Sequence, residues 1–427
     1  MVAIAVVAFI FFLMLQLPIA FGMGVASSIA IIYDGTLPLT LVVQRTVAGI
    51  DSFVLLAVPF YILAGSLMES GGISIRLVNL AKALVGHIRG GLGNVVVVAE
   101  YIFSGISGST AADISAVGSV LIPMMKKAGY SSPLTVSIIS AASAMGILVP
   151  PCIPMIVLGG IANISVAALF AGGFLPGALV ALFIMAFNYV QSSRQGLSVE
   201  MKASFNQLLN AVLHALIPLG LTLVIFGGVL SGIVTATEAG AVAVLYAAIV
   251  GLLVYREISL KRVFDLLIDT AVMTGQIMFL IGSASIFAWL MASQQVPNAI
   301  ATYLLWFSKN PFVFLVVTMF LFIFFSGLLE GLPALVIFVP ILIPIANQLH
   351  INLIHYGIVI IYSLGVGLFL PPVGVGLFIA CSIAQEPMHK VVKSFLPFLV
   401  VLILGGVAVV AFPYITTVLP KLLKLGG

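Results

Sequence analysis

Gly146-Ile147-Leu148-Val149-Pro150-Pro151 interrupts one long apolar stretch of this chain, and Gly367-Leu368-Phe369-Leu370-Pro371-Pro372 interrupts another in the same way. Two shorter motifs flank each copy: Leu121-Ile122-Pro123 and Phe174-Leu175-Pro176 in the first half, Leu342-Ile343-Pro344 and Phe395-Leu396-Pro397 in the second. All three pairs have the same offset, so the chain consists of two related halves. Paired apolar segments that are broken by glycine and proline at matching positions indicate a secondary transporter and mark its binding site.

The composition is that of a polytopic membrane protein. Hydrophobic residues make up 63% of the chain and charged residues 7%, which leaves too little polar surface for a soluble globular domain. Apolar runs long enough to cross a hydrocarbon core of ~30 Å recur from end to end. Residues 2–32 have no basic n-region and no cleavage site, so we expect a retained membrane helix there and not a signal peptide. The fold class is therefore all-α, with one membrane domain built of two halves.

Apolar length and helix breakers predict seven continuous spans, at residues 2–32, 52–69, 174–190, 212–233, 238–254, 270–292 and 395–419. Two more helices, 133–172 and 357–385, should be broken at their Pro-Pro pairs. Segments 94–125 and 313–349 have Ser/Gly-rich middles, where two arms of ~10–15 residues meet. Arms that short cannot cross, so each segment is predicted to be a re-entrant hairpin.

These elements divide the chain into a first repeat, residues 1–198, and a second repeat, residues 212–427. Residues 199–211 join the repeats, and the apolar and polar positions from Leu197 to Leu209 suggest either a short amphipathic helix on the membrane surface or an ordinary solvated linker.

The basic residues predict the topology. If residues 70–93 face the cytoplasm, the base of the first hairpin and the connections 191–211, 255–269 and 386–394 face it too. These stretches hold 12 of the 16 Lys and Arg residues, as the positive-inside rule requires. The N-terminus is then cytoplasmic and the C-terminus periplasmic. The two hairpins enter from opposite sides, so the repeats are inverted.

The first hairpin tip reads Ser104-Gly105-Ile106-Ser107-Gly108-Ser109-Thr110-Ala111-Ala112-Asp113. Hydroxyls and exposed backbone carbonyls at bilayer depth are tolerated only inside protein or beside a wet cavity. Oxygen ligands suit a hard cation such as sodium, and the start of a half-helix attracts a carboxylate. The alternative is a small-residue helix-packing motif.

The second tip, Ser326-Gly327-Leu328-Leu329-Glu330-Gly331-Leu332-Pro333, carries an acid at the break between two apolar arms. An intramembrane carboxylate is a functional candidate because its burial is costly. Glu330 could instead be a protonated acid or the N-terminal cap of the following arm. The carbonyls that the prolines of the two Pro-Pro breaks leave unpaired would be cation ligands facing these tips, although a proline kink that only shapes the core is the simpler alternative.

Other polar residues suggest local roles. Glu238, after Thr235, is predicted to cap a helix start. Cys152 and Cys381 lie in apolar segments and are expected to be small buried residues, and no two histidines have metal-ligand spacing. Gly105-Ile106-Ser107-Gly108 has the form found around the nucleophile of intramembrane serine proteases, but that enzyme would need His214, His350 or His355 as partner. An ion channel is a third alternative.

Several motifs together resemble the large, DctM-type membrane subunit of tripartite ATP-independent periplasmic (TRAP) transporters, over essentially the whole chain. They are Ala57-Val58-Pro59-Phe60 with Ala64-Gly65, the first tip followed by Ala116-Val117-Gly118-Ser119, the stretch from Gly146 to Pro154, and Thr235-Ala236-Thr237-Glu238-Ala239-Gly240-Ala241.

This resemblance implies a non-enzymatic, elevator-type fold of the ion-transporter superfamily, in which sodium drives the import of an organic acid across the bacterial inner membrane. Overall similarity favours the sialic-acid branch. The implied partners are a small four-helix membrane subunit on a separate chain, a periplasmic binding protein and membrane lipids, with no ATP, organic cofactor, transition metal or nucleic acid. A stand-alone sodium/carboxylate symporter of the same superfamily is the nearest alternative.

The tips and breaks, with the resemblance, give the candidate site residues. The substrate candidates are Ser107, Ser109, Thr110, Asp113, Pro151 and Glu330. The candidates for two or more sodium ions are Ser104, Ser107, Gly108, Gly146, Val149 and Pro150 in the first half, and Gly327, Gly331, Gly367, Leu370 and Pro371 in the second. Cys152 stands where many relatives would have a serine, so the resemblance does not extend to a hydroxyl contact there. We expect two similar sodium sites and a substrate pocket weighted towards the first tip.

Overall fold

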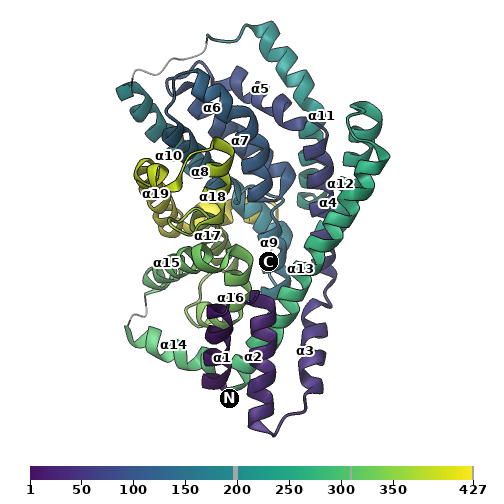
Figure 1. Ribbon diagram of the computed structural model, residues 1–427, viewed down its shortest axis with the longest axis vertical. Coiled ribbons are helices and arrows are strands. Elements are labelled where there is room, and N and C mark those ends of the chain that lie inside the picture. The colour runs from purple at the N-terminus through teal and green to yellow at the C-terminus, as the bar shows by residue number, and fades with distance from the viewer. Residues whose placement is uncertain (196–200, 308–309, 426–427) are drawn as a thin grey trace.

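The computed structural model describes residues 1–195, 201–307 and 310–425, and all regular secondary structure in these ranges is helical (Figure 1). Eight helical segments within them are long and apolar enough to cross a membrane. The predicted all-α polytopic fold is therefore confirmed.

The first half contains ten α-helices and one 3₁₀ turn. They are α1 (Val2–Met14), α2 (Ile19–Asp34), α3 (Thr40–Ile50), η1 (Phe53–Leu56), α4 (Ala57–Ser70), α5 (Ile73–Val85), α6 (Gly91–Ser107), α7 (Thr110–Lys127), α8 (Ser132–Gly146), α9 (Ile153–Ala162) and α10 (Val166–Gln195).

The second half contains ten α-helices and one π-helical turn. They are α11 (Phe205–Leu230), α12 (Ala236–Ile249), η2 (Val250–Val254), α13 (Leu260–Ser293), α14 (Val296–Phe307), α15 (Pro311–Leu329), α16 (Gly331–Gln348), α17 (Leu353–Gly367), α18 (Val375–Ala384), α19 (Met388–Ala411) and α20 (Pro413–Leu422).

The repeat is visible in the order of these elements. Each half has a helical hairpin (α6–α7 and α15–α16) followed by a broken helix (α8–α9 and α17–α18), and both Pro-Pro peptide bonds at the breaks are cis. The first arm of each hairpin packs on the first part of the broken helix of its own half. The second arm packs on the second part of the broken helix of the other half, so α7 contacts α18 and α16 contacts α9. The two halves therefore interlock at their breaks.

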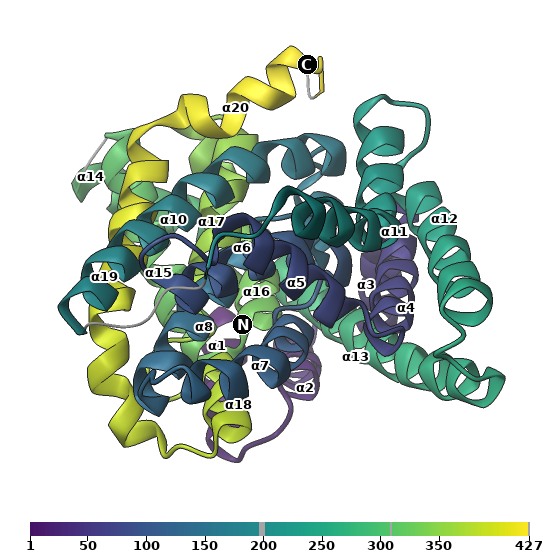
Figure 2. The same cartoon turned by 90° about the horizontal axis from the view of Figure 1, so that it is seen from above.

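Some of the remaining helices form a second layer that shows the same repeat. Helices α3, α4, α11, α12 and α13 lie together on one side of the molecule in both views (Figures 1 and 2). There α4 packs on α12, and α2 packs on α13. At the offset of the repeat, α13 corresponds to α3, η1 and α4 taken together, and α12 corresponds to α2. The contact of α4 with α12 and the contact of α13 with α2 are therefore equivalent in the two halves.

Several predicted boundaries are wrong. Residues 2–32 are not one span: the chain turns at Pro18, which lacks an N–H for a continuous helix, and α1 packs against α2 as an antiparallel pair. The segment 133–172 ends early, because Asn163 takes a left-handed conformation (φ 53°) and α10 begins at Val166. Segment 395–419 is divided at Phe412.

The hairpin arms and the linker also differ from expectation. The arms contain 17 to 19 residues, so their length alone would allow α15 and α16 to cross a membrane. The linker forms no helix of its own in its described part: residues 201–204 are irregular, and residues 205–211 belong to α11, which begins at a capping box of Ser204 and Gln207. Residues 197–200 of the predicted amphipathic stretch lie outside the described ranges.

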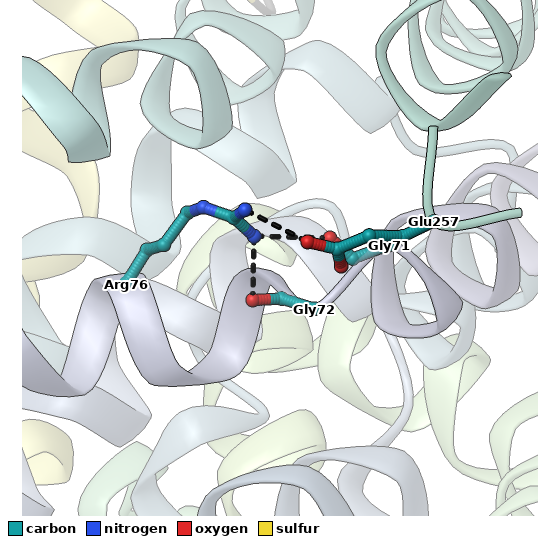
Figure 3. Close-up of polar contacts among 4 residues, drawn as sticks. All are labelled: Gly71, Gly72, Arg76 and Glu257. Atoms are coloured by element: carbon teal, nitrogen blue, oxygen red, sulfur yellow. Dashed lines mark hydrogen bonds and ion pairs between the residues drawn. The ribbon is translucent and has the colours of Figure 1, made fainter. Parts of the chain in front are cut away.

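Connections that the basic residues assigned to one side of the membrane are neighbours in the structure. Arg76 of α5 forms an ion pair with Glu257 of the α12–α13 connection, at 2.9 Å, and also donates to the carbonyls of Gly71 and Gly72 (Figure 3). The Gly90 carbonyl, between α5 and α6, accepts hydrogen bonds from Tyr130 of the α7–α8 connection and from Asn188 near the C-terminal end of α10. These contacts agree with the predicted grouping and leave open which side is cytoplasmic.

Candidate functional site

The first hairpin turns sharply at a glycine. Helix α6 ends at Ser107, Gly108 adopts a left-handed conformation (φ 67°) that a side chain disfavours, and Ser109 is extended before α7 begins at Thr110. The turn folds the first turn of α7 back towards the last turn of α6. Asp113 and the serines of the first tip are thereby brought together.

Asp113 is the centre of this tip. Its carboxylate accepts a hydrogen bond from Ser104 at 2.6 Å and a second from Ser107, and its side chain is only 2% exposed. In the described part of the chain no Lys or Arg forms an ion pair with it. A buried carboxylate with hydroxyl partners and no cationic neighbour is a strong attractor for a cation.

The first broken helix closes over this carboxylate. A Cβ on Gly146 would overlap Ser104 Oγ, and a Cβ on Gly108 would lie 3.1 Å from the Pro151 carbonyl oxygen. The backbone N–H of Ile153 donates to the Gly108 carbonyl at 3.4 Å. Only glycine allows the tip and the break to approach this closely.

A small cavity lies between the tip and the break. Its volume is ≈ 10 Å³ for the centre of a water-sized sphere, which is room for about one water or ion. Its lining includes eight of the predicted site residues: Ser104, Gly108, Ser109, Thr110, Asp113, Gly146, Val149 and Pro151. Carboxylate, hydroxyl and carbonyl oxygens around so small a space suit a hard cation. Pro150 is not part of this lining; its carbonyl oxygen would lie 3.4 Å from a Cβ on Gly105.

The second tip meets the second break in the same manner but with different chemistry. Ser326 donates to the Leu364 carbonyl at 2.8 Å, and Gly327 lies against the Gly367 carbonyl. The structure thus brings Gly327, Gly367 and Leu370 together, with Gly331 beside Leu364 and Ser326.

Glu330 occupies the turn of the second tip. Its φ of 69° and ψ of 166° belong to a region that is almost restricted to glycine, and its side chain is exposed. Glu330 is the N-cap residue of α16, as the capping alternative expects, but its side chain makes no capping hydrogen bond. The two tips differ: the buried acid is in the first and the exposed acid in the second.

The two breaks are adjacent. Helix α17 crosses α8 where a Cβ on Gly365 would lie 2.5 Å from the Ala144 carbonyl oxygen and 2.5 Å from a methyl group of Ile147. The inverted halves therefore place their broken helices against each other inside the molecule.

Comparison with known proteins identifies the family of this chain. The family model described as "Tripartite ATP-independent periplasmic transporter, DctM component" matches residues 6–415. This chain belongs to the DctM family.

The sialic acid TRAP transporter large permease protein SiaM of Vibrio cholerae is 35% identical to this DctM chain over 406 residues, which are 95% of each protein. The isethionate TRAP transporter permease protein DctMQ of Oleidesulfovibrio alaskensis is also 35% identical, over 92% of this chain and 62% of its own length. Among solved structures, the YdaH transporter of Alcanivorax borkumensis has a TM-score of 0.65, with 87% of each chain covered and 16% identity, which shows a shared fold.

Larger cavities of this DctM chain lie beside the first tip. One of ≈ 310 Å³ is lined by Ser107 and Ser109 together with Ser66 and Glu69 of α4. It shares Ser66, Glu69 and Met273 with a wider cavity of ≈ 590 Å³ that continues past Arg262. These volumes are in the range of small-molecule sites. Ser107 thus donates to the Asp113 carboxylate and also lines the cavity of ≈ 310 Å³.

Sequence reasoning missed three residues around the first tip. A Cβ on Gly65 of α4 would overlap the Ser107 carbonyl oxygen, Thr222 of α11 donates to the Gly105 carbonyl at 3.2 Å, and Glu100 of α6 is fully buried. The signal for Glu100 was present in the sequence, as an acid within an apolar hairpin arm. Nothing local in the sequence indicates the contacts of Gly65 and Thr222, which join distant segments.

The structure gives no support to a serine-protease site. The Ser107 hydroxyl is bound to a carboxylate, whereas His214 contacts the Asn210 carbonyl and His355 contacts Thr416. Within the described ranges no three or more His, Cys, Asp or Glu residues are grouped so that they could hold a metal ion, and both cysteines are free and buried. Thr235 and Glu238 form a reciprocal capping box at the start of α12, so the predicted role of Glu238 is confirmed.

Proposed function

We propose that this DctM chain moves an organic acid across the bacterial inner membrane together with sodium ions. The observation that supports the proposal best is the first tip: a buried carboxylate, Asp113, with hydroxyl ligands and no ion-pair partner in the described chain, beside a cavity of ionic size. A sodium ion there would balance the charge. The second tip, with Gly327 and Gly367, would hold a second ion with neutral oxygens.

The substrate would occupy the cavity of ≈ 310 Å³ beside the first tip, which Ser107 and Ser109 help to line. Sialic acid is our choice of substrate, since SiaM of V. cholerae is similar over almost the whole chain. The equal identity to an isethionate permease means that identity alone does not select the substrate.

The transport cycle would be an elevator motion of the hairpins and broken helices against the layer of α3, α4 and α11–α13. The small membrane subunit would be a partner of this chain, because the family is that of a tripartite transporter. A periplasmic binding protein would deliver the substrate. A stand-alone symporter would need no such protein, and a channel would pass large unitary currents.

The helix pair α1–α2 changes the proposed topology at one end. With residues 70–93 cytoplasmic, the connection between α2 and α3 is periplasmic, and the antiparallel pair puts the N-terminus on that same side. We therefore propose a periplasmic N-terminus in place of the cytoplasmic one expected from a single span, and we keep the proposal of a periplasmic C-terminus.

Uptake by proteoliposomes tests the proposal. The chain is reconstituted with its small subunit and binding protein, and labelled sialic acid is offered with and without an inward sodium gradient. We expect uptake only with sodium and with both partners, and none that requires ATP. Equal uptake without sodium would refute the coupling, and equal uptake without the binding protein would favour the stand-alone symporter.

A further inference from the structure

Glu69 carries the only charged side chain among the described residues that line the cavity of ≈ 310 Å³ beside the first tip. It lies half-buried in the last turn of α4, and Ser66, about one turn earlier, lines the same cavity. Within the described ranges its carboxylate forms no hydrogen bond and no ion pair. The acid is therefore available to a molecule in the cavity.

Two helix ends of opposite polarity meet this cavity. Ala111 and Ala112 line it from the first turn of α7, where backbone N–H groups have no acceptor within the helix and the helix dipole is positive. Glu69 lines it from the C-terminal end of α4, where the dipole is negative. Asp113 also lies in the first turn of α7 but does not line this cavity, and the proposed sodium ion balances its charge. One carboxylate is thus favoured beside α7, and a second one beside Glu69 is disfavoured.

The other polar side chains of the cavity carry hydroxyl groups. Its described lining contains no Lys, Arg or His, and its serines are Ser66, Ser107, Ser109 and Ser115. Arg262 lines the wider cavity of ≈ 590 Å³ and not this one. A ligand with many hydroxyl groups can donate to Glu69, and hydrogen bonds to an ionised acceptor are strong. A second carboxylate would find no cationic partner in this lining and would face a like charge.

We propose that Glu69 determines the class of substrate. It accepts hydrogen bonds from the hydroxyl groups of a sugar acid that carries one carboxylate, and its charge excludes dicarboxylates. This inference rests on the proposed function, because that function places the substrate in the cavity of ≈ 310 Å³. It adds a selection by charge and hydrogen bonding, which sequence identity to the relatives does not supply.

Two variants separate the charge of Glu69 from its shape. Glu69→Gln keeps the size of the side chain and an oxygen that accepts hydrogen bonds, and it removes the charge. Asp269→Asn is the matched control, because Asp269 is an acid of α13 that lines the wider cavity and not the cavity of ≈ 310 Å³. If selection depends on the charge of Glu69, only the first variant should admit a dicarboxylate.

The assay is equilibrium binding to the chain purified together with its small subunit. The binding protein is left out, because it would impose a selectivity of its own. Labelled sialic acid is bound in the presence of sodium and is displaced with unlabelled sialic acid or with succinate, which should displace it only weakly from wild type. Glu69→Gln should improve displacement by succinate relative to sialic acid by about tenfold or more, because it removes a like charge at short range. Asp269→Asn, at an exposed and screened position, should change this ratio by less than about twofold.

Succinamate provides a test that needs no variant, so the proposal stays testable if Glu69→Gln does not fold. It resembles succinate with an amide in place of one carboxylate, and wild type should bind it about tenfold more tightly than succinate. Equal displacement by these two ligands, an unchanged ratio in Glu69→Gln, or an equal change in Asp269→Asn overturns the role of Glu69. Displacement curves that are the same without sodium overturn the sodium coupling of the proposed function and leave the selectivity result standing. Binding of neither sialic acid nor succinate overturns both.

Discussion

Gly146→Ala is the sharpest test of the first site. A methyl group there would overlap Ser104 Oγ and would lie 3.2 Å from Ser104 Cβ. The overlap can be relieved if Ser104 changes rotamer, but its hydroxyl then loses the 2.6 Å hydrogen bond to Asp113. A hydrogen bond to a charged group contributes about 1.5–3 kcal/mol, and the remaining overpacking costs about 1–3 kcal/mol.

The expected result is a weaker sodium response in a folded protein. If the lost hydrogen bond contributes fully to sodium binding, half-activation by sodium should shift upwards roughly tenfold to a hundredfold. The assay is sodium-dependent uptake in proteoliposomes, with thermal unfolding of the purified chain measured in parallel. Gly275→Ala is the matched control, because no atom lies within 4 Å of a Cβ at that position in α13.

A double variant separates packing from binding. Ser104→Ala removes the overlapping oxygen, so Gly146→Ala with Ser104→Ala should recover thermal stability compared with Gly146→Ala alone. The hydrogen bond to Asp113 is still missing, so sodium activation should stay weak. Half-activation within twofold of wild type in Gly146→Ala, or an equal loss in Gly275→Ala, would refute the reasoning.

Three further predictions concern other parts of the chain. Gly65→Ala should abolish uptake while the chain still folds, because its methyl group would overlap the Ser107 carbonyl oxygen at the contact of α4 with the tip; uptake similar to that of Gly275→Ala would contradict this. Arg76→Gln and Glu257→Gln should each lower thermal stability slightly, by about 1 kcal/mol for a partly exposed pair, and the double variant should lose less than the sum; full additivity would argue against the ion pair. Thr235→Ala should destabilise the chain by about 1 kcal/mol through loss of the α12 cap, measured by thermal unfolding, with uptake per folded molecule unchanged.

The repeat and the breaks could be predicted because they depend on local chemistry. Proline at 150 and 151 and at 371 and 372 removes backbone hydrogen bonds wherever it stands, and glycine at 108 permits a left-handed turn without help from distant residues. The chemical identity of the first tip was visible for the same reason. Its hydroxyls and Asp113 all lie between positions 104 and 113, so a single turn brings them together.

Other features required knowledge of packing. Helix α5 lies between glycines and carries Arg76 and Lys82, so its sequence is typical of a basic connection. In the structure it is an amphipathic helix that packs on α6, α7 and α11. Its buried side chains include Ile73, Leu77 and Leu80. The turn at Pro18 lies inside an apolar run that is long enough for one span, so apolar length alone predicts a single helix there. No local pattern shows that a Cβ at Gly65 would meet Ser107, because that contact joins α4 to the first hairpin.

The two copies of the site are alike in backbone and unlike in charge, and this difference has a mechanistic consequence. In the first copy the acid, Asp113, is buried, and the proposed sodium ion would balance its charge before the tip is sealed in an apolar environment. In the second copy Ser326 bonds to a backbone carbonyl and the acid, Glu330, is exposed, so the empty tip carries no buried charge. The first site would therefore set the energetic link between ion binding and movement. The second would contribute through neutral oxygens, and the shared backbone of the repeat would carry both ions through the same motion.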